Sequence, residues 1–163
     1  MATVPGATQE PIPDEHNVSR GCVELPPGVD PGSVFVFQYD ETLKDRVESV
    51  YWRKYAITND AVHDRECRRE KIRQARATPS NPPKPYVGFR TSNVGAIRVI
   101  RTGRGHAFAV VHWPENGDLA HTHICIRPNG DTSVRKMKRS DIRELIHLLF
   151  KQFVQFEPHK CTS

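Results

Sequence analysis

The fold is decided by residues 106–126, which read HAFAVVHWPENGDLAHTHICI. Asn116-Gly117 lies between two alternating apolar runs, and this dipeptide is the strongest short-range signal for a two-residue hairpin turn. With this turn, Trp113 pairs with Ala120 and every side chain of the two strands is assigned to a face. The sequence therefore predicts an antiparallel hairpin with a defined register.

Three histidines lie on one face of the hairpin in this register. His112 is directly opposite His121, and His123 shares their face because strand side chains alternate. The other face is nearly all apolar, as expected for a sheet that is covered on one side. We therefore predict that the side chains of these three histidines converge.

Converging imidazoles are typical of a metal site. Two ligands from His121 and His123 with a third from His112 could bind zinc or another divalent transition metal at about 2.1 Å, with one position open for water. Such a water can attack an ester or phosphodiester bond. The nearby carboxylates are Glu115 and Asp118 in the turn. The simpler alternative, three partly exposed histidines that hydrogen-bond to water and neighbours, stays open.

The rest of the sequence predicts an α+β fold. Apolar spacing indicates a strand near 34–39, a helix at 41–57 and a C-terminal helix at 141–154. A charge-dense helix without a clean apolar stripe is expected at 61–77, where Asn59 or Asp60 would start it. Between them, turn signals separate an antiparallel β-meander of about five strands, at roughly 86–91, 96–102, 106–113, 120–127 and 132–138. The C-terminal helix should cover one face of the sheet, with the other two helices at a side. Residues 1–33 are rich in proline and acidic, and they predict a flexible tail before a single domain at 34–163.

The chain is basic, with a net charge of +5. The acidic tail holds Arg20 as its single Lys or Arg, so residues 34–163 carry a larger positive charge than the whole chain. Guanidinium groups match phosphate oxygens, and clustered basic residues are typical of polyanion-binding surfaces. The candidate residues for such a surface are Arg65, Arg69, Arg73, Arg76, Arg98, Arg101, Arg135, Lys136, Lys138 and Arg139.

These features support three functions. The first is a basic binding protein for nucleic acid or another polyanion. The second is a metal-dependent hydrolase, for example a phosphodiesterase, that uses the three-histidine site. The third is an interaction module, an inhibitor or adaptor, for an acidic protein. Whether the protein is an enzyme stays open at this stage.

Two observations bear on location. No apolar run approaches the roughly 20 residues that span a bilayer, so no membrane association is expected. The four cysteines are widely scattered, with no Cys-x-x-Cys pair, which favours reduced thiols in the cytoplasm.

Overall fold

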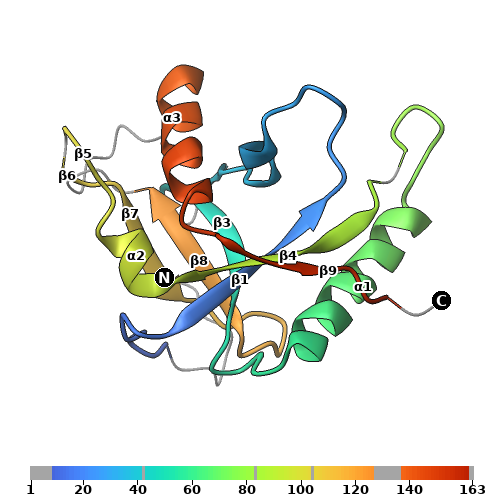
Figure 1. Cartoon of the computed structure of the whole chain (residues 1–163), viewed down its shortest axis with the longest axis horizontal. Helices are drawn as coiled ribbons and strands as arrows, with labels where there is room; N and C mark the ends of the chain where they lie inside the picture. The colour runs from blue at the N-terminus through green and yellow to red at the C-terminus, as the bar shows by residue number, and fades with distance from the viewer. Residues whose placement is uncertain (1–8, 42, 83, 104, 127–136, 162–163) are drawn as a thin grey trace.

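The computed structural model describes residues 9–161 except 42, 83, 104 and 127–136 (Figure 1). The strands are β1 (Asn17–Val23), β2 (Gln38–Asp40), β3 (Asp45–Trp52), β4 (Tyr86–Asn93), β5 (Arg101–Thr102), β6 (Gly105–His106), β7 (Phe108–His112), β8 (His121–Ile126) and β9 (Gln155–Pro158). The helices are α1 (Asn59–Ala75), α2 (Val94–Arg98) and α3 (Arg139–Phe150), with a short 3-10 helix, η1, at Pro31–Val34. None of these helices is long and apolar enough to cross a membrane.

The main sheet is antiparallel and has the strand order β7-β8-β3-β1-β4-β9, with β2 paired to β3. β5 and β6 form a separate ladder. The predicted α+β class, the antiparallel sheet and the C-terminal helix are confirmed. The predicted meander is wrong, because β1, β3 and β8 lie between β4 and β7 in the sheet.

The two faces of the sheet pack against different helices. The larger core includes Val50 and Ile124 of the sheet together with Ile97 of α2 and Leu149 of α3. The opposite face carries Tyr51 and Phe89, which pack with Val62 of α1. Figure 1 shows α3 above the central strands and α1 below them.

The predicted tail contains a central strand. Residues 17–23 form β1, which pairs with β4 over its whole length and with β3 at its start. Val18 and Cys22 are buried in the larger core. The prolines at positions 11, 13, 26 and 27 flank this stretch but do not interrupt it, so the composition of the region concealed a strand. The description of residues 1–33 as a flexible tail is therefore wrong for this segment.

The predicted helix at 41–57 is a strand over Asp45–Trp52. β3 lies between β8 and β1, and its end is buried on both faces, with Val50, Tyr51 and Trp52 in contact with the two cores. A strand buried on both faces does not alternate between apolar and polar residues, so its spacing imitated that of a helix.

The other element predictions have mixed outcomes. Helices at 61–77 and 141–154 are confirmed as α1 and α3. The strand predicted at 96–102 is confirmed only at its end, where Arg101–Thr102 form β5; its first three residues belong to α2, because the Asn93 side chain accepts a hydrogen bond from the Ala96 N–H and caps a helix there. Most of the strand predicted at 132–138 lies outside the described residues.

The cysteines are not all reduced. Cys67 of α1 and Cys161 after β9 form a disulfide, whereas Cys22 and Cys125 are buried thiols. The prediction of four scattered thiols is wrong because residues far apart in the sequence meet in space. Since structural disulfides persist mainly in oxidising compartments, the basis for the predicted cytoplasmic location is lost.

Candidate functional site

The hairpin has the predicted turn but a different register. Asn116 and Gly117 have φ angles of 52° and 76°, and a type I′ hairpin turn requires positive φ at both of these positions. Beyond the turn, however, β7 pairs His112 with Thr122. Glu115 still bridges Asp118, so the second strand contains one extra residue between the turn and the ladder.

This extra residue is a β-bulge, and its cause is local. Pro114 has no N–H and cannot donate to a ladder. Opposite it, the Ala120 N–H donates to the Asp118 side chain at 2.9 Å, and the Ala120 carbonyl accepts from Trp52 N at 2.8 Å. The backbone groups of Ala120 thus form their hydrogen bonds with partners other than Pro114. Compared with the predicted register, the one-residue insertion places each side chain of β8 on the opposite face of the sheet.

His112 consequently lies on the core face, away from His121 and His123. It is 1% exposed and packs against the rings of Trp52 and Tyr55. Its Nδ1 accepts the Glu10 N–H at 3.0 Å, and its Nε2 lies 2.7 Å from the Leu119 carbonyl, to which it donates. The prediction that three histidines share one face is wrong, and the role of His112 in the structure is to hold two loops on the core.

His121 and His123 do lie together on the opposite face, with their ring centroids 5.0 Å apart. His121 Nδ1 is 2.7 Å from the Trp113 carbonyl, and its Nε2 is 3.1 Å from Ser49 Oγ. Because Nδ1 donates to a carbonyl, the neutral ring has its hydrogen on Nδ1, and Nε2 is the acceptor.

His123 is more deeply buried than His121. It is 6% exposed and stacks on Trp113, and among the described residues its Nδ1 has no hydrogen-bond partner. Burial, assisted by the neighbouring His121, lowers the pKa of His123 to about 4. The ring is therefore neutral at neutral pH, which is the form that binds metal ions.

Glu115 supplies the third group beside these two histidines. Its Oε2 is 3.9 Å from His121 Nδ1, and one ligand atom each from Glu115, His121 and His123 lie within 4.8 Å of one another. Because of the β-bulge, His112 does not lie beside His121 and His123, and the carboxylate of Glu115 lies there instead. In the sequence, the position of Glu115 beside the turn was the signal that its carboxylate could reach the histidines.

The cluster opens on a groove between α1 and the hairpin. A cavity of about 540 Å³ is lined by Ser49, Tyr51, Arg65, Arg68, Arg69, Ile72, Glu115, Asn116, Asp118 and His121. A second cavity of about 310 Å³ shares Ser49 and Arg69 with it and extends the groove along β3.

The arginines of α1 differ in how they are held. Arg65 forms an ion pair with Asp118 at 3.0 Å. Although burial opposes it, hydrogen bonds from Arg65 and from the Ala120 N–H keep the pKa of Asp118 below its ordinary value. Arg69 lies 3.4 Å from Glu66 Oε1. Arg68 lines the cavity and makes no ion pair or hydrogen bond within the described part of the chain.

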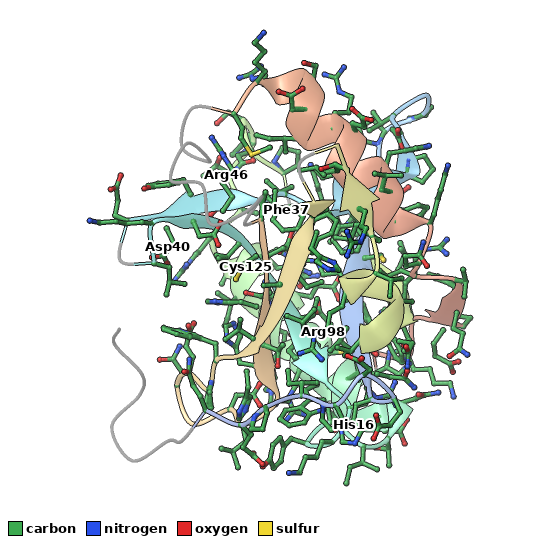
Figure 2. All side chains as sticks on the ribbon, turned by 90° about the vertical axis from the view of Figure 1, so that its left-hand side faces the viewer. His16, Phe37, Asp40, Arg46, Arg98 and Cys125 are labelled. Carbon is green, nitrogen blue, oxygen red and sulfur yellow. A yellow bond between two sulfur atoms is a disulfide. The ribbon has the colours of Figure 1, made fainter. Side chains whose placement is uncertain are left out.

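The remaining predicted basic residues are not part of this groove. Arg73 and Arg76 follow on α1 toward its C-terminal end. Arg98 of α2, labelled in Figure 2, lies on the other face of the sheet. It binds Asp14 at 2.8 Å and the Val110 carbonyl at 3.2 Å. Arg101 contacts His106 at 3.0 Å.

Lys138 and Arg139 begin α3, on the same side of the sheet as α2. Arg135 and Lys136 lie outside the described residues. The described members of the predicted basic surface are thus divided between the two sides of the sheet, and a single surface does not contain them.

Comparison with protein-family models, with curated proteins and with solved structures found no match for this chain.

Proposed function

We propose that the protein is a metal-dependent hydrolase whose divalent metal ion is bound by Glu115, His121 and His123. The observation that carries this proposal is the convergence of these three ligands on one face of β8 and the turn, together with the unpartnered Nδ1 of buried His123. Two histidines and a carboxylate are a common ligand set of catalytic zinc, which keeps a fourth position for water.

The surroundings favour this use of the cluster. Ligating histidines commonly donate their second N–H to a backbone carbonyl, which orients the ring. His121 has this arrangement, because its Nδ1–H donates to Trp113 and its Nε2 is available once Ser49 Oγ moves aside. A bound metal ion would lower the pKa of its water so that hydroxide forms near neutral pH.

The arginines on α1 indicate the charge of the substrate. When a divalent cation binds Glu115, the positive charges of Arg68 and Arg69 give the groove an excess of positive charge. A phosphate ester or phosphodiester suits such a groove, because guanidinium groups pair with its oxygens. The proposed substrate is therefore an anionic ester small enough for the groove.

The test uses protein that is purified without an affinity tag, stripped by a chelator and supplied with zinc or manganese. We expect hydrolysis of bis(4-nitrophenyl) phosphate or 4-nitrophenyl phosphate only after metal addition. His123→Ala and Glu115→Gln should each reduce the rate by at least the roughly 10–100-fold typical of damaged metal sites. His147→Gln, an exposed histidine on α3, is the matched control and should retain the rate. Equal hydrolysis by all variants, or no hydrolysis with either metal, would overturn the proposal.

Binding of nucleic acid, of another polyanion or of an acidic protein stays a prediction. Its support is weaker than that of the hydrolase, since the arginines of α1 and those of α2 lie on different sides of the sheet. Counterion release requires such binding to weaken steeply with salt, and a salt titration measures this.

A further inference from the structure

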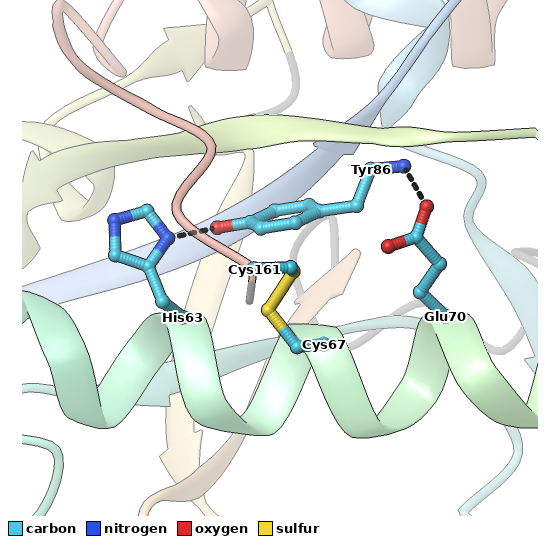
Figure 3. Close-up of a disulfide and its surroundings, with 5 residues drawn as sticks. All are labelled: His63, Cys67, Glu70, Tyr86 and Cys161. Atoms are coloured by element: carbon cyan, nitrogen blue, oxygen red, sulfur yellow. Dashed lines mark hydrogen bonds between the residues drawn. A yellow bond between two sulfur atoms is a disulfide. The ribbon is translucent and has the colours of Figure 1, made fainter. Parts of the chain in front are cut away.

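The disulfide lies outside the groove, on the side of α1 that faces the C-terminal segment. It joins Cys67 to Cys161 across 94 residues, with the Cα atoms 5.6 Å apart. Figure 3 shows Cys67 and Glu70 on the same face of α1, as residues three apart on a helix should be. Glu70 Oε1 accepts the Tyr86 N–H at 3.0 Å, which leaves its second oxygen available.

Four metal-binding side chains meet at this disulfide. One ligand atom each from Glu70, His159 and Cys161 lie within 4.8 Å of one another, and Cys67 Sγ is bonded to Cys161 Sγ. Within the described residues, the ring of His159 makes no hydrogen bond and only packs against Tyr86. His63 is not among the residues whose ligand atoms lie within 4.8 Å of one another, and its Nδ1 is hydrogen-bonded to the Tyr86 hydroxyl at 2.9 Å.

The group is accessible from solvent. Cys67, Glu70, His159 and Cys161 all line a cavity of about 560 Å³. Arg68, Lys71 and Lys160 line the same cavity, and neighbouring cations favour the thiolate form of cysteine. A reductant can therefore reach the sulfur atoms, and the thiolates formed there would be stabilised.

We propose that reduction of the Cys67–Cys161 disulfide creates a zinc site with the ligands Cys67, Cys161, His159 and Glu70. A dithiol reductant supplies two electrons and two protons to the S–S bond and becomes a disulfide itself. Zinc then displaces the two thiol protons and binds both thiolates, one imidazole nitrogen of His159 and the Glu70 carboxylate.

The distances suit this exchange. Zinc–ligand bonds of 2.0–2.3 Å place tetrahedral ligand atoms about 3.3–3.8 Å apart. The present separations of up to 4.8 Å need to shorten by roughly an ångström, and the sulfur atoms separate once their bond is broken. The metal would then replace the disulfide as the link between α1 and the C-terminal segment, so the link would persist under reducing conditions.

Cobalt titration tests the inference, and the variant His123→Ala removes the proposed hydrolase site from the measurement. The protein is reduced with a phosphine, which departs as its oxide with oxygen from water, and excess phosphine is removed without air. We expect one equivalent of Co²⁺ to produce sulfur-to-cobalt charge-transfer absorption in the reduced protein and none in the oxidised protein. Far-ultraviolet circular dichroism should show the same helix content in both.

The controls separate this site from other thiols and from the groove. The double variant Cys67→Ser/Cys161→Ser retains buried Cys22 and Cys125 and should lose the absorption. His159→Gln and Glu70→Gln should weaken Co²⁺ binding by roughly tenfold or more, whereas Gln152→Ala, a surface control, should not. Absence of the absorption in reduced protein, or its persistence in the double variant, would overturn the inference. Neither result bears on the hydrolase proposal, whose ligands contain no sulfur.

Discussion

Gly21 of β1 lies directly beneath the carboxylate of Glu66 of α1. A Cβ atom at position 21 would be 2.1 Å from Glu66 Cδ, so only glycine leaves room for this side chain. The carboxylate accepts a hydrogen bond from the Tyr51 hydroxyl at 2.8 Å and is near Arg69. Burial and the Glu66 charge together raise the pKa of Tyr51, which keeps its hydroxyl as the donor. The contact between β1 and α1 thereby holds Tyr51, which lines the groove.

Gly21→Ala should destabilise the protein. Glu66 is 2% exposed, so moving its carboxylate breaks the bond with Tyr51 in a buried environment. We expect a loss of about 1–3 kcal/mol in the free energy of unfolding, measured by urea denaturation. Gly103→Ala is the control, because a Cβ there meets nothing within 4 Å. Equal stability of the two variants would show that Glu66 is not held as described.

His112→Ala should separate stability from metal binding. The substitution removes a buried ring and leaves the Glu10 N–H and the Leu119 carbonyl without their partner. We expect a loss of about 2–4 kcal/mol in the free energy of unfolding, with the metal content of the folded protein unchanged. Metal content is measured by plasma mass spectrometry. A stable variant that has lost its metal would show that His112 contributes to the metal site.

Glu48 should make the stability of the protein depend on pH. Burial raises its pKa above the ordinary 4.5, and Arg20, at 3.3 Å, only partly opposes the shift. In the pH range between these two pKa values the folded protein holds a proton that the unfolded chain has lost, so stability falls as pH rises through this range.

The test compares the wild type with Glu48→Gln by urea denaturation at several pH values, from roughly 4 to 7. The free energy of unfolding of the wild type, relative to that of the variant, should decrease as pH rises and then become constant. A relative stability that increases with pH would mean that Arg20 outweighs burial.

Prediction from sequence succeeded where the signal was local. The φ requirements of Asn116 and Gly117 located the turn, the start signal at Asn59 located α1, and the apolar spacing of α3 located the C-terminal helix. Register failed because a single bulge residue opposite Pro114 reverses the faces of β8, and nothing in the alternation of that strand reveals it. His121 and His123 remained together since both lie on β8.

Features that depend on contacts between distant parts of the chain could not be predicted from the periodicity of apolar residues. The end of β3 is buried on both faces because the two cores pack against opposite sides of the sheet there, and this arrangement is not visible in its own sequence. The disulfide likewise depends on β9 pairing with β4, which brings Cys161 to α1. Glu115 could be proposed from its place beside the turn, but its role required the corrected register.

The most direct test of the central claim is the position of a bound metal ion. Crystals of the oxidised protein grown with zinc should give an anomalous difference peak, present above the zinc absorption edge and absent below it. We predict this peak between the side chains of Glu115, His121 and His123, and its loss in crystals of His123→Ala. A peak elsewhere, or no peak in the wild type, would contradict the account.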